Sequence, residues 1–229
     1  MKKYLLILIG ILNIYSFVVF AQSKYYKHSN DWLKKSEACK PAFVYKKHFP
    51  LRIVKSVKDE KAYQGWRMED VSNVEILFNE SLKKHSGIIL DFGEHLTGTF
   101  NFSLKILGER IASDAPIRLK FTFAEVPSEL NTPFDPYPGG LSRAWLQDEI
   151  ITLMTVPIEA SIPRRLSFRY LKIDVLGASS FDFAFDKMSF TAQSAVEMIE
   201  MDLATTTDPL IKKINEVGLY SKRMYANCV

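Results

Sequence analysis

The stretch that decides the fold is IRLKFTFAEV, residues 117–126. Its apolar side chains at Ile117, Leu119, Phe121 and Phe123 alternate with polar ones. Successive side chains of a strand point to opposite faces of a sheet, so a period of two predicts a strand with one buried face. The stretch therefore predicts a sheet that packs on an apolar core.

Residues 100–106 show the same alternation, and Gly108–Pro116 supplies a turn before residue 117. We expect these two strands to be antiparallel neighbours. A change of phase near Tyr170 predicts a β-bulge, because one extra residue moves the apolar set to the other face. Similar patterns predict further strands at residues 51–57, 74–78, 86–92, 149–156, 166–176 and 181–190.

About eight strands without an internal repeat predict an all-β fold, an antiparallel β-sandwich of jelly-roll-like type over residues 49–204. Residues 22–48 are polar and rich in lysine, and we interpret them as an irregular leader. At residues 205–229 the apolar period becomes helical, after the helix-start signal Thr207–Asp208–Pro209. This predicts one C-terminal amphipathic helix, the start of a further helical domain.

The first 21 residues predict a secretory signal peptide. Lys2 and Lys3 precede the apolar stretch Tyr4–Phe20, and the small residue Ala21 follows it. We expect cleavage after Ala21, a secreted or periplasmic location, and no stable membrane anchor after cleavage. Removal of this segment lowers the formal charge from +4 to +2.

Composition and motifs exclude several function classes. A nearly neutral mature chain without a basic-aromatic motif argues against a nucleic-acid partner. No phosphate-binding loop, dinucleotide fingerprint or nucleophile elbow is present, so we expect no cofactor. The four histidines lack the spacing of metal ligands, so we expect no metal. Cys39 and Cys228 lie near opposite ends of the chain, and the sequence leaves open whether they pair.

Five motifs occur in order along the chain: DFG at 91–93 with GTF at 98–100, LKFTFAEV at 119–126, Asp148 before a strand, FRYLKI at 168–173 with Gly177, and TDPLIKKI at 207–214. Each motif alone recurs in many sandwiches. Together and in this order they resemble the front part of bacterial α-L-rhamnosidase-like glycoside hydrolases of the Bacteroidetes type.

The resemblance implies a β-sandwich ahead of a catalytic (α/α)₆ barrel, with the catalytic acid and base in the barrel. It implies that this chain ends inside the first barrel helix. We therefore assign no catalytic residue to this chain. The partners that the resemblance implies are a glycan or oligosaccharide and a C-terminal helical domain.

The long loop between residues 127 and 147 is the best candidate for sugar binding. Long loops in compact domains are often functional. Sugars offer apolar faces to aromatic rings and hydroxyls to polar groups, so a mixed loop has suitable chemistry. The same aromatic residues are also suited to packing on the sandwich or on a helical domain. The candidate carbohydrate-binding residues are Phe134, Asp135, Tyr137, Arg143 and Trp145.

Charged residues in otherwise apolar strands are a second candidate feature. Glu125 and Arg169 both lie in such strands, and we expect them to form a structural ion pair. Asp91 and Glu94 flank a turn, and we interpret them as solvated surface acids.

Three functions remain open on this evidence. The first is an accessory, non-catalytic portion of a glycoside hydrolase. The second is a free-standing carbohydrate-binding module that uses the loop, and the third is an envelope adhesion sandwich.

Overall fold

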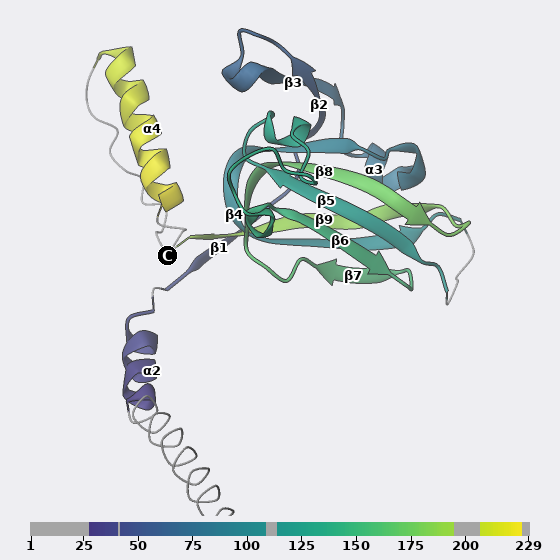
Figure 1. The fold of residues 1–229 in the computed structure, drawn as a ribbon, viewed down its shortest axis with the longest axis horizontal. Helices are drawn as coiled ribbons and strands as arrows, with labels where there is room; N and C mark the ends of the chain where they lie inside the picture. The colour runs from purple at the N-terminus through teal and green to yellow at the C-terminus, as the bar shows by residue number, and fades with distance from the viewer. Residues whose placement is uncertain (1–27, 41, 109–113, 195–206, 226–229) are drawn as a thin grey trace, which may run out of the picture. The chain divides into compact units, whose positions relative to one another are not determined.

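The computed structural model describes residues 28–40, 42–108, 114–194 and 207–225 (Figure 1). The segment predicted as a signal peptide and Cys228 lie outside these ranges. Contacts divide the chain into two units, residues 1–42 and 43–229. The first unit contains α2 (Ser29–Ala38), a helix without buried residues.

Nine strands of the second unit form one hydrogen-bonded antiparallel sheet within the described residues, which confirms the predicted all-β antiparallel fold. Short helices α3 (Ile76–Asn79), η1 (Tyr63–Gly65), η2 (Leu82–Lys84), η3 (Glu129–Asn131) and η4 (Arg143–Trp145) interrupt the strands. The strands are β1 (Val44–His48), β2 (Arg52–Lys58), β3 (Trp66–Ser72), β4 (Ile88–Ile106), β5 (Ile117–Ala124), β6 (Asp148–Leu153), β7 (Ile158–Ser161), β8 (Leu166–Ala178) and β9 (Phe183–Ser194).

The long strand β4 joins the two layers of the fold. Its first part pairs with β8 and β2, and its second part pairs with β9 and β7. One layer therefore has the order β3-β2-β4-β8-β5-β6, and the other has the order β1-β9-β4-β7. The β2–β3 hairpin extends beyond its short pairing with β4 (Figure 1).

Phenylalanines fill the space between the layers. Phe102 of β4 lies with its ring centroid 5.0 Å from that of Phe121 of β5, and Phe168 of β8 lies 4.7 Å from Phe190 of β9. The Phe168–Phe190 pair meets edge to face, the arrangement that the ring quadrupoles favour. Burial of each such ring contributes about 1.5–3 kcal/mol.

The expected pairing of residues 100–106 with residues 117–123 was wrong. The two segments face each other across the core, where Phe100 and Phe121 lie 5.5 Å apart, and each pairs with other strands. Alternation predicts the buried face of each strand but does not decide whether the connection makes a hairpin or crosses between layers.

Two further predictions need correction. Residues 22–48 were expected to be irregular, but they contain α2 and the edge strand β1. Strand β1 buries almost nothing, so its side chains show no apolar alternation. Residues 74–78 were predicted as a strand, but they contain the start of α3, where the fully buried Leu77 and its apolar neighbours pack against the core.

The phase change near Tyr170 does mark an irregularity. The extra residues, however, belong to β4: the register passes from Asp91 opposite Tyr170 to Leu96 opposite Phe168. Four residues of β4 therefore lie opposite Arg169 alone, and they form a short excursion, residues 92–95.

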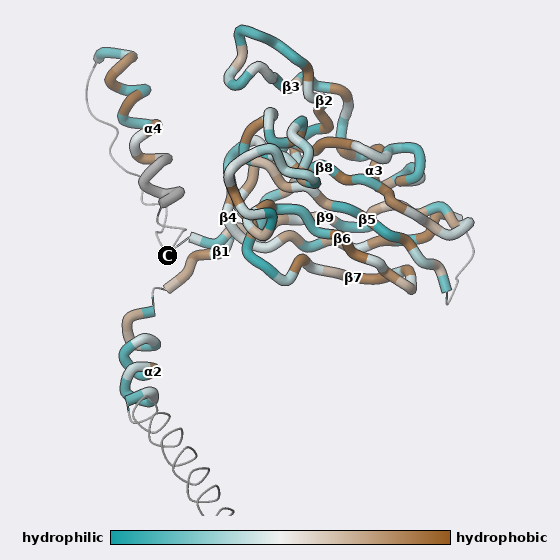
Figure 2. The backbone as a smooth tube through the Cα atoms, viewed as in Figure 1, coloured by the Kyte–Doolittle hydropathy of each residue, from teal (hydrophilic) through white to brown (hydrophobic). Residues whose placement is uncertain are grey.

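The predicted C-terminal helix is present as α4 (Pro209–Tyr225). The carboxylate of Asp208 accepts hydrogen bonds from the backbone N–H groups of Leu210 (2.8 Å) and Ile211 (3.4 Å), which caps the helix. Figure 2 shows hydrophobic residues recurring along α4. Among the described residues, no helix has both the length and the apolarity needed to cross a membrane.

Candidate functional site

The loop between β5 and β6 closes over a pocket of about 190 Å³. Its lining comes from the end of β5 and from the loop that contains η3 and η4. The lining residues are Phe123, Glu125, Glu129, Thr132, Phe134, Tyr137, Leu141, Trp145, Leu146 and Gln147. One continuous stretch of the chain therefore brings both aromatic and carboxylate groups to one small site.

Gln147 fixes the C-terminal end of this loop. Its side-chain amide donates to the carbonyl of Ser167 (2.8 Å) and accepts from the N–H of Ser167 (2.7 Å). Its own carbonyl accepts from the N–H of Phe123 (2.8 Å). Because both side-chain positions of Gln147 bond to the backbone of β8, the loop ends in a defined place beside β5 and β8.

The η3 segment fixes the other end of the loop. Asn131 donates to the hydroxyl of Ser56 on β2 (2.5 Å), and Ser128 bonds to the side chain of Gln64. The loop is thus tied to the β2–β3 hairpin as well as to β8.

Aromatic side chains form one wall of the pocket. The rings of Phe134 and Tyr137 meet edge to face with centroids 6.5 Å apart. The guanidinium of Arg143 lies 5.8 Å from the Phe134 ring centroid and donates to the carboxylate of Asp148 at 2.6 Å. Trp145 is 76% exposed, so its ring is available to another molecule.

The predicted sugar-binding residues divide into two groups. Phe134, Tyr137 and Trp145 line the pocket, while the Arg143 guanidinium lies over the Phe134 ring. Asp135 is not among the lining residues. Sugar contact by these five residues stays a prediction.

Two carboxylates that face this pocket have different environments. Glu125 lies 3.2 Å from Nε2 of His95, and this hydrogen bond lowers the pKa of Glu125. Glu129 accepts from the backbone N–H of Glu125 (2.8 Å), but burial, with the nearby Glu125 charge, raises the pKa of Glu129. Nε2 of His95 also lies 3.1 Å from the hydroxyl of Ser167.

The predicted ion pair of Glu125 with Arg169 was wrong in its pairing. Glu125 pairs with His95, and Arg169 pairs with Asp91. The excursion of β4 explains the difference, since it brings His95 to the end of β5 while Asp91 remains in the strand beside β8.

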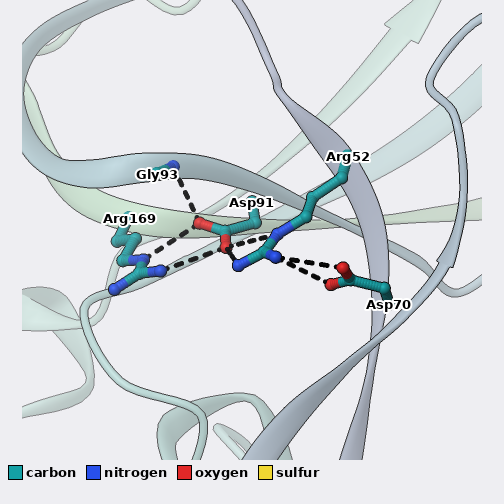
Figure 3. Close-up of polar contacts among 5 residues, drawn as sticks. All are labelled: Arg52, Asp70, Asp91, Gly93 and Arg169. Carbon is teal, nitrogen blue, oxygen red and sulfur yellow. Dashed lines mark hydrogen bonds and ion pairs between the residues drawn. The ribbon is translucent and has the colours of Figure 1, made fainter.

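The buried carboxylate of Asp91 forms an ion cluster with Arg52 and Arg169 (Figure 3). Arg169 donates to both of its oxygens, at 2.9 and 3.1 Å, and Arg52 donates to Oδ2 at 2.8 and 3.1 Å. The backbone N–H of Gly93 donates to Oδ1 at 2.8 Å, and Arg52 also pairs with Asp70 at 2.9 Å. Three strands and the β4 excursion are thereby joined by one carboxylate.

Hydrogen bonds to the carboxylate of Asp91 keep it ionised despite its burial. Burial alone would raise the pKa of Asp91, but hydrogen bonds from Arg169, Arg52 and the Gly93 N–H lower it below its ordinary value. Asp91 therefore carries its negative charge between two guanidinium groups.

The interpretation of Asp91 as a solvated acid was wrong, because its side chain is fully buried. The sequence does contain a signal for this: Asp91 lies inside the apolar run IILDF, residues 88–92. Glu129 and Gln147 were also missed as site residues, and nothing in their local pattern distinguishes them from other polar loop residues.

Within the described ranges, no group of three or more His, Cys, Asp or Glu side chains is arranged to hold a metal ion. Three of the histidines have a ring nitrogen close to a glutamate carboxylate: His48 to Glu94 at 3.4 Å, His85 to Glu80 at 3.0 Å, and His95 to Glu125 at 3.2 Å.

Comparison with known proteins identifies the family of the chain. The family described as glycosyl hydrolase family 78 alpha-rhamnosidase N-terminal domain matches residues 50–192. The chain belongs to this family. A solved rhamnosidase from Klebsiella oxytoca, with rhamnose bound, is 33% identical and has a TM-score of 0.76 over 87% of this chain. The resemblance inferred from the motifs is therefore confirmed.

The chain spans 38% of the length of that Klebsiella oxytoca rhamnosidase. A family 78 rhamnosidase of Bacillus sp. GL1 is 14% identical over 48% of this chain and 10% of its own, with a TM-score of 0.32. A TM-score this low supports no conclusion about this chain. A search of curated proteins gives no match.

Proposed function

We propose that this chain is the accessory, non-catalytic β-sandwich portion of an α-L-rhamnosidase-like glycoside hydrolase that acts on glycans. One observation carries the proposal: the similarity to the Klebsiella oxytoca rhamnosidase extends over 87% of this chain but only 38% of the relative. Most of the relative therefore has no counterpart here, and the catalytic acid and base are expected in that part.

A C-terminal helical domain is the proposed intramolecular partner. The sandwich is followed by α4, a capped amphipathic helix with large apolar side chains exposed. An apolar helical face contributes to stability when it packs against other helices. We propose that α4 is the first helix of that domain.

The test compares this 229-residue chain with the same chain extended through the rest of its reading frame. Hydrolysis of a chromogenic α-L-rhamnoside is expected only from the extended protein. Comparable hydrolysis by the 229-residue chain would refute the non-catalytic role, and an extension that adds no hydrolysis would refute the parent activity.

The pocket in the β5–β6 loop favours a second candidate, a carbohydrate-binding module that acts without a catalytic partner. An open reading frame that stops at Val229, together with glycan binding by the chain, is the result that would favour this second candidate.

The proposed location is secreted or periplasmic, with cleavage after Ala21. It is supported by the basic pair Lys2–Lys3 and the apolar stretch that follows. N-terminal sequencing of the protein recovered from the periplasm or medium is expected to begin at Gln22. A mature protein that begins at Met1 would contradict it.

A further inference from the structure

The β5–β6 loop pocket combines aromatic rings with carboxylates, and support of a neighbouring domain does not require this combination. Its lining includes aromatic rings, with Trp145 largely exposed, and the carboxylates of Glu125 and Glu129. Leu141, also exposed, extends the apolar surface at the pocket mouth. A surface of this kind matches a molecule with one apolar face and several hydroxyl donors.

The geometry points to a sugar-binding subsite in this pocket, which takes a single neutral pyranose ring. The ring stacks on Trp145 beside Tyr137, and its hydroxyl groups donate to Glu125 and Glu129. The inference rests on the proposed function for the choice of L-rhamnose as the first sugar to test.

The size of the pocket limits the ligand to one ring. Sites for drug-sized ligands measure roughly 300–1,000 Å³, whereas this pocket measures about 190 Å³. A longer glycan can therefore place one residue in the pocket, while its remaining rings extend past Trp145.

The charges around the pocket favour a neutral ligand over an anionic one. Glu125 and Glu129 both line it, and a carboxylate or phosphate on the ligand would meet them at short range. The nearby cationic side chain, Arg143, is paired with Asp148 at 2.6 Å. Its charge is thus largely compensated outside the pocket.

The pocket is formed before any ligand arrives. Gln147 bonds to both backbone groups of Ser167, and the carbonyl of Leu146 accepts from Arg164 at 3.1 Å. Asn131 ties the other end of the loop to β2. A fixed site loses less conformational entropy on binding than a loop that must first be ordered.

The experiment measures the affinity of the full chain for L-rhamnose, D-galactose and D-glucuronate by saturation-transfer NMR titration. Trp145→Ala is expected to weaken neutral-sugar binding by about tenfold through loss of stacking. Trp32→Ala is the matched control, because Trp32 is also exposed but lies in α2, outside the pocket lining. Tyr137→Ala is the second test variant.

Neutral-sugar binding that Trp145→Ala and Tyr137→Ala weaken and Trp32→Ala leaves unchanged supports the subsite. Absence of binding to the unmodified chain, or equal binding by all variants, overturns it. Binding of D-glucuronate as tight as that of the neutral sugars overturns the ligand class. Failure of the parent activity would appear as an inactive extended protein, a result independent of these titrations.

Discussion

The buried carboxylate of Asp91 links β2, β4 and β8 through Arg52, Arg169 and the Gly93 N–H. Asp91→Asn removes the negative charge and leaves two guanidinium groups facing each other. Loss of one partner of a buried pair costs about 3–5 kcal/mol. We expect about 3 kcal/mol, at the lower end, because the side chains of Arg52 and Arg169 are 43% and 34% exposed. Urea denaturation measures the loss.

Asp70→Asn is the matched control for this substitution. Asp70 pairs with the same Arg52 but is 68% exposed, and exposed pairs contribute about 0–1 kcal/mol. Its loss should therefore be below about 1 kcal/mol. Equal losses for the two variants would show that burial of Asp91 does not matter to stability.

Acid should remove the contribution of Asp91. Its pKa in the folded state is lowered from an ordinary value of 3.8, mainly by Arg169 and Arg52 acting against burial. A lowered pKa gives stability that is present above the ordinary value and is lost as the pH falls through the folded-state value. The gap in melting temperature between the unmodified chain and Asp91→Asn should be constant from pH 7 to about pH 5 and shrink below about pH 4. A gap at pH 3 as large as the gap at pH 7 would contradict this.

The charge of Glu129 should lower the stability of the fold at neutral pH, whereas the charge of Asp91 raises it. Burial and the charge of Glu125 raise its pKa above 4.5, so its ionised form costs stability in the folded chain at neutral pH. Glu129→Gln keeps an oxygen acceptor for the Glu125 N–H and removes the charge. Thermal melts should show a higher melting temperature for the variant at pH 7 and no difference at pH 3. A lower melting temperature at pH 7 would mean that the charge stabilises the loop.

Glycine at position 98 allows β4 to change partners. Gly98 is paired with Leu166 of β8 and with Ala192 of β9, at the point where β4 passes between the layers. A Cβ at this position would lie 2.0 Å from the carbonyl oxygen of Thr191, which is backbone of β9. We expect Gly98→Ala to cost at least the 1–3 kcal/mol typical of overpacking, because β9 must move away. Chemical denaturation checks this.

Gly177 provides the control for Gly98. It lies in β8 with open space around the position of a Cβ. Gly177→Ala should be neutral or stabilise slightly, because alanine restricts the unfolded chain. If Gly98→Ala were equally neutral, β9 would be able to shift at the crossover without loss of pairing.

Strands with one face in the core were predictable from the sequence, and edge strands were not. The second part of β4, β5, β8 and β9 have apolar side chains at alternate positions because each faces the core on one side. Strand β1 has Lys46 and Lys47 at an edge, and it forms because β9 offers a pairing partner. That partner is remote in sequence, so local pattern does not reveal it.

The residues of the candidate site were also predictable only in part. Its aromatic residues stood out by composition, and the predicted residues Phe134, Tyr137 and Trp145 line the pocket, although their contact with a sugar stays a prediction. Glu129 and Gln147 gain their positions from contacts with Glu125 and Ser167, which depend on how β5, β6 and β8 are ordered. The partners of Arg169 and Glu125 depend on the β4 excursion, a register feature that alternation alone does not specify.

The whole chain combines a well-packed sandwich with a helix whose apolar side chains are exposed. In α4, Leu210, Ile214 and Val217 are more than half exposed, whereas the core phenylalanines Phe100, Phe121 and Phe168 of the sandwich are fully buried. Exposed apolar clusters promote association. Deletion of residues 207–229 should therefore reduce self-association in sedimentation velocity and leave the melting temperature unchanged. A lower melting temperature after deletion would show that α4 packs on the sandwich. Replacing Lys212 and Lys213 by alanine, which keeps the apolar face, is the control and should not reduce association.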